Sequence, residues 1–91
     1  MNIRKDILIS ILTRLAGIYP DCTDEHTYRE YVSEQTSEKI FMGHLLYLAE
    51  KGLIETDLRW DIGHRKYQLT PGLLRINCNG LDFLKEQARV L

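Results

Sequence analysis

The residues best suited to metal binding or covalent catalysis are the two cysteines and three histidines, which are scattered along the chain. Cys22 and His26 are four residues apart, a spacing that would place both on one face of a helix. However, Cys22 belongs to the loop before the expected helix, and no second pair of ligands has zinc-site spacing. Cys78 and a histidine could form a nucleophilic pair, but no catalytic motif surrounds them. We therefore expect no metal, no cofactor and no enzymatic activity, and we interpret His44 as a partly buried, hydrogen-bonded residue.

A second group of chemically informative residues is basic and lies between positions 59 and 66. Its members are Arg59, His64, Arg65 and Lys66. Side chains of this kind neutralise backbone phosphates, and the adjacent Trp60 could stack on a base. Two alternatives stay open, because Asp57 and Asp61 could form cross-strand ion pairs with these cations, and Trp60 could cover the core instead.

The charge distribution argues against DNA binding and favours a basic protein partner. The whole chain has a net charge of −1, whereas DNA-binding modules usually carry a basic surplus. Residues 21–38 contain six carboxylates against one arginine, which gives a local charge of −5 and would repel phosphates. Within this segment, Glu30 and Glu34 are suited instead to a basic protein partner.

The length of the chain indicates a single domain, residues 1–91. The spacing of its apolar residues predicts a first helix. We expect this helix to begin with Asn2 as its cap and to end before Pro20. Its apolar stripe consists of Ile3, Ile7, Ile11, Leu15 and Ile18, widened by Leu8 and Leu12. Ile9 would lie on the opposite face of the helix.

The second and third helices are expected to form a helix-turn-helix. Thr23 or Asp24 would cap the second helix, whose apolar face is Tyr28, Tyr31 and Val32. The third helix would extend from Ser37 to Lys51, with Thr36 or Ser37 as its cap and Gly52 as the residue after its end. Its buried stripe would be Phe41, Leu45 and Leu48, and its exposed positions Glu38, Lys39, Met42, Gly43, Leu46 and Glu50.

The chain after Gly52 predicts short strands and a final helix. Residues 53–60 indicate one strand, 61–64 a hairpin tip and 65–70 the return strand, with Tyr67 and Leu69 on one face. A brief third strand, 73–76, would follow a turn at Pro71, and Asn77 or Asn79 would cap the last helix. The apolar stripe of that helix is Leu81, Leu84, Ala88 and Leu91. The core is expected to include Ile7, Ile11, Leu15, Phe41, Leu45, Leu48, Ile54, Leu69, Leu81 and Leu84.

The order of these elements resembles the second half of a winged-helix domain. The resemblance depends on residues 48–54, Leu-Ala-Glu-Lys-Gly-Leu-Ile, then on the hairpin, and then on Gly-Leu-Asp-Phe-Leu-Lys-Glu at 80–86. Over nearly its full length the chain is similar to small winged-helix proteins, including the phage-associated YjcQ-type group. The resemblance implies an α+β winged helix with a three-helix core, a small antiparallel hairpin wing and a C-terminal helix. It also implies DNA binding, with the third helix in the major groove.

Two functions agree with these features. The first is a small DNA-binding transcriptional regulator of phage or prophage origin, in which Lys39 contacts bases and the wing contacts the phosphates of double-stranded DNA. The alternative is a winged-helix protein-interaction module that does not bind DNA. Its contact residues would be Glu30, Glu34, Met42, Leu46 and Tyr47.

Further expectations concern assembly and location. We expect a homodimer, because the wide stripe of the first helix and the off-stripe Phe83 offer surplus apolar surface. No apolar run is long enough to span a bilayer, and no cleavage site follows the N-terminal residues. We therefore expect a cytoplasmic protein without membrane contact, whose two cysteines are reduced and structural.

Overall fold

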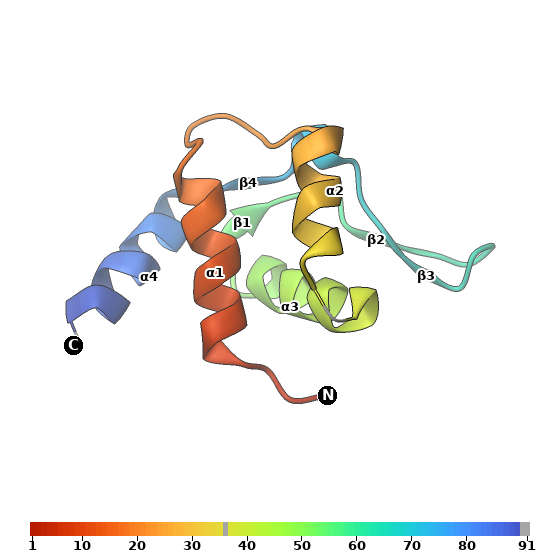
Figure 1. Cartoon of the computed structure of the whole chain (residues 1–91), viewed down its shortest axis with the longest axis horizontal. Helices are drawn as coiled ribbons and strands as arrows, with labels where there is room; N and C mark the ends of the chain where they lie inside the picture. Colours follow the sequence, from red (N-terminus) through yellow and green to blue (C-terminus); the bar gives the residue numbers. More distant parts are fainter. Residues whose placement is uncertain (36, 90–91) are drawn as a thin grey trace.

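The computed structural model describes residues 1–35 and 37–89. Three helices come first: α1 (Lys5–Ala16), α2 (Glu25–Ser33) and α3 (Glu38–Glu50). They are followed by β1 (Ile54–Glu55), β2 (Arg59–Asp61), β3 (Lys66–Gln68), the 3-10 turn η1 (Pro71–Leu73), β4 (Arg75–Ile76) and α4 (Cys78–Arg89). The result is a small α+β fold, in which the β2–β3 hairpin extends from one end of the long axis and α4 lies at the other (Figure 1). The predicted positions Thr36 and Leu91 lie outside the described residues.

Polar caps determine where α2 and α3 begin. Asp24 Oδ1 accepts a hydrogen bond of 2.7 Å from the Thr27 N–H, and Ser37 Oγ accepts one of 3.3 Å from the Ile40 N–H. Each bond satisfies a backbone donor that the helix itself leaves unpaired. α3 is followed by Gly52, whose φ of 72° lies in the left-handed region that glycine tolerates. Of the predicted cap candidates, Asp24 therefore caps α2 and Ser37 caps α3, and the prediction that Gly52 follows α3 is confirmed.

The predicted start of α1 is wrong, because the helix begins at Lys5 and Asn2 does not cap it. The cap position belongs to Arg4, whose backbone N–H donates to His44 Nε2 at 2.9 Å. This contact ties the first residues to α3 before α1 begins. Ile3 lies before the first residue of α1 and Ile18 lies after its last, although their spacing predicted that both belong to the helix.

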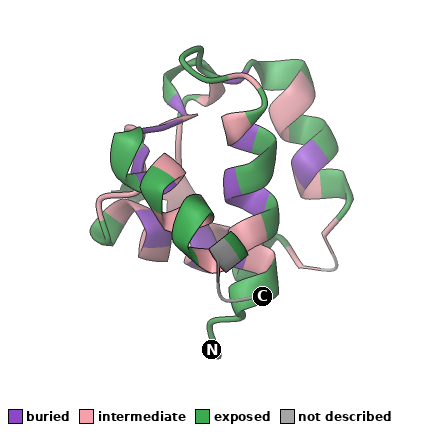
Figure 2. Cartoon of the chain, turned by 90° about the vertical axis from the view of Figure 1, so that its left-hand side faces the viewer, coloured by how far each residue is buried: buried purple, intermediate pink, exposed green. Residues whose placement is uncertain are grey.

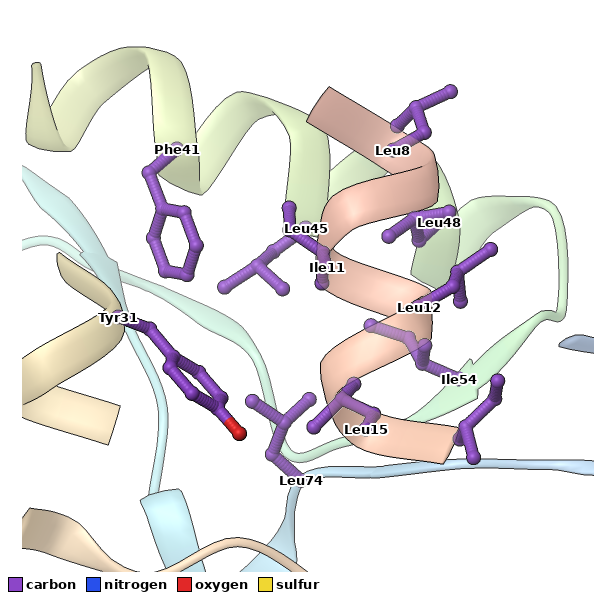
Figure 3. Packing of buried hydrophobic residues seen from close by; sticks show 11 residues of the cluster. Leu8, Ile11, Leu12, Leu15, Tyr31, Phe41, Leu45, Leu48, Ile54 and Leu74 are labelled. Carbon is purple, nitrogen blue, oxygen red and sulfur yellow. The ribbon is translucent and has the colours of Figure 1, made fainter. Parts of the chain in front are cut away.

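The core lies between the three N-terminal helices and the β1–β4 ladder (Figure 3). Its buried side chains are Leu8, Ile11, Leu12, Leu15, Tyr31, Phe41, Leu45, Leu48, Ile54, Leu74 and Ile76. Four predicted core residues pack only at its edge, namely Ile7, Leu69, Leu81 and Leu84. The other six predicted core residues are buried, and buried stretches alternate with exposed ones along the helices (Figure 2). The wide stripe of α1 is therefore used inside the molecule, since Leu8 and Leu12 both face the core.

The prediction of one strand over residues 53–60 is wrong. The chain leaves β1 after Glu55 and enters β2 only at Arg59, and the two strands belong to different sheets. β1 pairs antiparallel with β4, and β2 pairs antiparallel with β3. Between them the Leu58 N–H donates to Thr56 Oγ1 at 3.2 Å rather than to a neighbouring strand. A side-chain bond of this kind competes with the sheet ladder and bends the chain.

Asn77 connects the β1–β4 ladder to α4. Its Oδ1 accepts a 3.0 Å hydrogen bond from the Gly80 N–H, which makes it the cap of α4, and its Nδ2 donates to Gly52 O at 2.9 Å and Glu55 Oε2 at 2.8 Å. A Cβ atom at Gly80 would collide with the carbonyl oxygen of Leu53 and with a β4 side chain. The first turn of α4 therefore approaches the ladder so closely that only glycine fits there.

Candidate nucleic-acid interface

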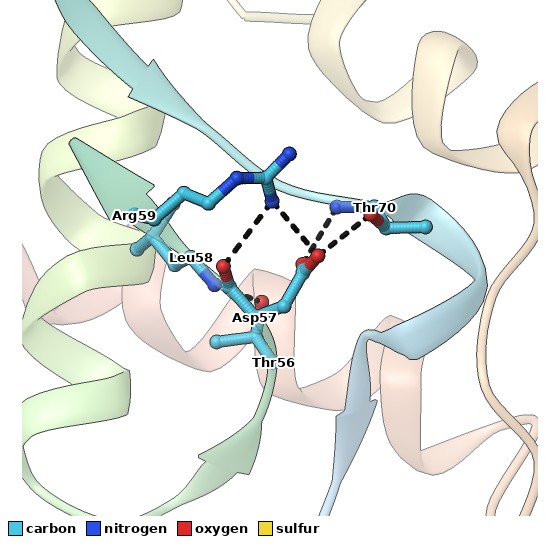
Figure 4. A network of polar contacts seen from close by, with 5 residues as sticks. All are labelled: Thr56, Asp57, Leu58, Arg59 and Thr70. Atoms are coloured by element: carbon cyan, nitrogen blue, oxygen red, sulfur yellow. Dashed lines mark hydrogen bonds and ion pairs between the residues drawn. The ribbon is translucent and has the colours of Figure 1, made fainter. Parts of the chain in front are cut away.

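Asp57 closes the base of the β2–β3 hairpin (Figure 4). Its carboxylate accepts a 2.7 Å hydrogen bond from the Thr70 N–H and a 2.6 Å hydrogen bond from the Thr70 hydroxyl. Arg59 Nη1 lies 2.8 Å from the same carboxylate. The hydrogen bonds from Thr70 hold the pKa of Asp57 below its ordinary value, so the group stays charged at more acidic pH than an ordinary aspartate does. Asp57 is thus committed to contacts within the hairpin.

Asp61 organises the hairpin tip in the same way. Its Oδ1 accepts hydrogen bonds from the backbone N–H groups of Gly63 at 2.9 Å and His64 at 3.3 Å, and its Oδ2 lies 2.7 Å from His64 Nδ1. The contact with the His64 side chain lowers the pKa of Asp61. The turn occupies residues 62–65, where Arg65 has a φ of 53°. The hairpin's ion pairs therefore join residues near in sequence, and the cross-strand pairs that we considered are not formed in the described residues.

The strand register places an aromatic pair on one face of the hairpin. Trp60 lies opposite Tyr67, and their rings meet edge to face with 5.2 Å between centroids. Trp60 is 53% exposed, so the interpretation of this side chain as a cover for the core is wrong. The reason is the bend before Arg59, which directs the hairpin away from the helices. Because side chains alternate along a strand, Arg59 and Lys66 lie on the other face.

The cations predicted to bind DNA belong to two elements. Four lie on the hairpin: Arg59, His64, Arg65 and Lys66. Lys39 lies in the first turn of α3, which Figure 1 places toward the same end of the long axis. Asp57 forms an ion pair with Arg59, and Asp61 contacts the His64 imidazole. Within residues 1–35 and 37–89, no carboxylate lies within ion-pair distance of Lys39, Arg65 or Lys66, which leaves these three for an external anion.

Ion pairs engage the carboxylates along α2 and at its end, although these side chains remain exposed. Glu30 Oε1 lies 3.0 Å from His26 Nε2, and Glu25 pairs with Arg29 on the next turn. Glu34 pairs with Arg14 of α1, a cation from outside the acidic segment. Such exposed pairs add little stability. Only Arg14 adds a positive charge that the segment charge of −5 does not already include, so the repulsion from phosphate is reduced mainly beside Glu34.

The N-terminal residues partly cover the face of α3 that we expected to be exposed. The Met1 side chain lies against Gly43, where it would collide with any Cβ atom. His44 is fully buried, with its Nδ1 2.7 Å from the Ile40 carbonyl oxygen and its Nε2 accepting the Arg4 N–H. A carbonyl only accepts and a backbone N–H only donates, so the imidazole is the neutral tautomer protonated on Nδ1. His44 is hydrogen-bonded as predicted, but it is fully rather than partly buried.

The apolar partner candidates of α3 do not form one surface. The Tyr28 hydroxyl donates to Met42 Sδ at 3.4 Å, so Met42 packs toward α2. Burial of this hydroxyl, with the nearby charge of Glu38, raises the pKa of Tyr28 to about 12. Tyr47 instead lines a groove shared with α4, and Leu46 stays partly exposed.

Some residues with structural or electrostatic roles were not identified from the sequence. Thr70 closes the hairpin base, although it is 13 positions from Asp57 and belongs to no recognisable motif. Lys5 begins α1 and Lys51 follows α3, and the fold brings both to the groove that Tyr47 lines. Only the tertiary structure shows that Thr70 contacts Asp57 and that the two lysines lie at the same groove.

Other expected features can be placed within the described part of the chain. No group of three metal-binding side chains gathers there, and no helix there combines the length and the apolar character needed to cross a bilayer. Cys22 and Cys78 are unbridged and exposed, so their interpretation as packed structural residues is wrong.

Comparisons of this chain with protein-family models, curated proteins and solved structures find no match. The arguments for a function therefore depend on the geometry of the molecule itself.

Proposed function

We propose that the protein is a small winged-helix DNA-binding regulator whose wing, the β2–β3 hairpin, makes the main phosphate contacts. The order of elements supports this layout, because three helices precede a small antiparallel hairpin and a last helix. In such a module α3 enters the major groove and the hairpin lies against the backbone. A phage or prophage origin, which the resemblance implies, belongs to the same proposal.

The observation that carries the proposal is the internal engagement of the hairpin's carboxylates. Asp57 is held by Thr70 and Arg59, and Asp61 is held by the tip residues. Neither carboxylate forms an ion pair with the adjacent cations Arg65 and Lys66. The exposed indole of Trp60 lies on the same hairpin, on the face opposite Arg59 and Lys66.

Binding of this kind would be mainly electrostatic, with limited discrimination between sequences. Base readout requires Arg, Lys, Asn or Gln on the helix that enters the groove. Lys39 is the one such side chain among the outward positions that we assigned to α3. A homodimer, which we include in the proposal, would place two hairpins on one duplex and double the number of phosphate contacts.

Fluorescence anisotropy with labelled duplex DNA of about 20 base pairs tests this function. The double variant Arg65→Ala/Lys66→Ala should weaken binding to all duplexes alike and should reduce the salt slope by about one for each lost contact. Lys39→Ala should instead change the preference among duplexes. Lys85→Ala, an exposed position on α4, is the matched control. Absence of wild-type binding at low salt, where electrostatic attraction is strongest, would exclude the function.

A protein-interaction module that does not bind DNA is the second candidate. The observation in its favour is that the side chains of Glu30 and Glu34 remain 60% and 48% exposed despite their ion pairs. Glu30→Lys/Glu34→Lys should then abolish association with a basic protein, whereas the hairpin double variant should have no effect. A pull-down and a gel shift on the same two variants distinguish the candidates.

A further inference from the structure

A groove of about 540 Å³ lies at the opposite end of the molecule from the hairpin. Three parts of the chain line it: the first residues of α1 with the segment before them, the end of α3, and α4. The lining residues that matter most are Ile3, Lys5, Tyr47, Lys51 and Phe83. Its volume falls in the range of ligand sites, but the groove is open to solvent, which suits an extended or helical segment better than an enclosed small molecule.

The apolar lining is larger than the core requires. Ile3 precedes α1 and is 39% exposed. Phe83 lies off the main apolar stripe of α4 and only partly packs against the core. Tyr47 is also only partly buried. These side chains offer a concave apolar surface of the kind that receives a bulky anchor residue.

The rim of the groove is positively charged. Lys5 and Lys51 line it, no carboxylate lines it within the described residues, and neither lysine forms an ion pair there. The Lys51 Nζ lies 5.6 Å from the centre of the Tyr47 ring, which keeps the ammonium group above the apolar surface. The carboxylate beside Lys5 in sequence, Asp6, is bound to Arg4 at 2.8 Å. Two unpaired lysines above apolar side chains therefore favour an acidic occupant.

We propose that this groove binds an acidic segment of another protein, which inserts a bulky apolar side chain between α1 and α4 and pairs its carboxylates with Lys5 and Lys51. A second copy of this chain fits less well. The apolar face of its acidic α2 is packed inside its own core, where Tyr31 is buried. Its exposed hairpin residue Trp60 is accompanied by cations, which the two lysines would repel. Neither of these two segments combines an exposed apolar anchor with surplus acids, so we assign the occupant to a different protein.

None of the described residues that line the groove belongs to the β2–β3 hairpin, so a segment can bind in it whether or not the hairpin binds DNA. It would give the protein a second contact surface, which a protein partner and a nucleic acid could occupy together.

The test uses the whole ¹⁵N-labelled chain and a designed peptide of about twelve residues, made of glutamate and aspartate around a central Leu-Phe pair. Backbone amide shifts should change at residues 3–8, 47–53 and 83–87 and should leave the hairpin unchanged. Replacing Leu-Phe by Ser-Ser, or the acids by lysines, should remove these changes. Absence of shifts at millimolar peptide, or equal shifts with the control peptides, would overturn the proposal.

Charge reversal on the protein completes the test. Lys5→Glu/Lys51→Glu should weaken peptide binding by about tenfold or more, because attraction becomes repulsion at two positions. Lys85→Glu reverses one charge on α4 outside the groove, as each of the two substitutions does inside it, and should bind as the wild type does. Lys5→Gln/Lys51→Gln, which avoids new charge, should give an intermediate loss in case the reversed variant folds poorly. A concentration-dependent dimer of the unliganded protein that the same substitutions abolish would overturn the proposal in favour of a second copy.

Discussion

The two short antiparallel ladders of this molecule, β1–β4 and β2–β3, are similar in length and are held together by different forces. In the first, the paired residues Ile54 and Ile76 are 4% and 0% exposed, and the ladder forms one wall of the core. In the second, the paired residue Trp60 is 53% exposed, and the contacts with Asp57 and Asp61 are polar. Burial therefore supports one ladder and hydrogen bonding supports the other.

This difference indicates which ladder suits which task. Removal of apolar surface from water contributes much more to stability than solvent-exposed polar contacts do. The β1–β4 ladder is thus part of the folded body, and it positions α4 through Asn77. The hairpin can open or change shape at small cost, which suits an element that must fit against a partner.

The largest expected effect comes from truncating the buried ladder. Ile76→Ala should lower the free energy of unfolding by about 2–5 kcal/mol, because it leaves a cavity at a fully buried position. Trp60→Ala, the corresponding truncation in the exposed hairpin, should cost about 1 kcal/mol or less. Urea unfolding followed by far-UV circular dichroism measures both. Equal losses of unfolding free energy in the two variants would contradict the conclusion that burial stabilises one ladder and hydrogen bonding the other.

A smaller loss is expected where α4 approaches the buried ladder. Gly80→Ala should destabilise the fold by about 1–3 kcal/mol, because the new methyl group collides with the Leu53 carbonyl oxygen. Gly72→Ala is the matched control, since no atom lies within 4 Å of its added Cβ. Thermal melts of the two variants provide the comparison, and a Gly80→Ala melt identical to that of the wild type would refute the close approach.

The hairpin should respond locally rather than globally. Asp57→Ala removes the acceptor of both Thr70 hydrogen bonds and the partner of Arg59, and should lower global stability by only about 1 kcal/mol. Hydrogen exchange at the Thr70 amide should accelerate, while exchange at Ile76 stays slow. Asp21→Ala, an exposed loop position, is the control. Equal acceleration at both amides would show that the two ladders open together.

Acid should produce the smallest effect, again at the hairpin. The pKa values of Asp57 and Asp61 lie below their ordinary value in the folded chain. Each carboxylate therefore contributes stability that is fully present above the unfolded pKa near 4 and is lost as pH falls through the lower folded pKa. Emission of the single tryptophan, Trp60, should change at a higher pH than the far-UV signal does. Coincident transitions would contradict separate opening of the hairpin.

Local chemistry made several features predictable from residues close together in the chain. Ser37, Gly52 and Asn77 act within one helical turn of their own positions. The sequence therefore predicted Gly52 as the terminator and gave two candidates for each cap, of which the structure shows Ser37 and Asn77. The stripe of Phe41, Leu45 and Leu48 was predictable for the same reason, because helical period alone places these residues on one face.

Hydrogen bonds between backbone amides and side chains, one local and one between distant residues, explain the incorrect predictions. The segment from Leu53 to Trp60 alternates apolar or β-branched residues with charged ones and predicted one continuous strand, but the Thr56 hydroxyl binds the Leu58 amide and bends the chain. α1 begins late because His44, 40 positions away, accepts the Arg4 amide. In both cases a side-chain atom accepts a hydrogen bond from a backbone amide and changes where a strand or helix begins. The order of residues alone does not show which side chain will accept that bond.

The sequence by itself determined the number and type of the helices, the small antiparallel hairpin and the basic character of residues 59–66. These properties follow from periodicity, capping and side-chain charge, which act over a few residues. Only the tertiary structure decided which charges remain unpaired. Asp57 and Asp61 are engaged within the hairpin, whereas Lys5 and Lys51 share a groove without carboxylates. Distance between side chains decides pairing, and the packing of α1, α3 and α4 sets that distance.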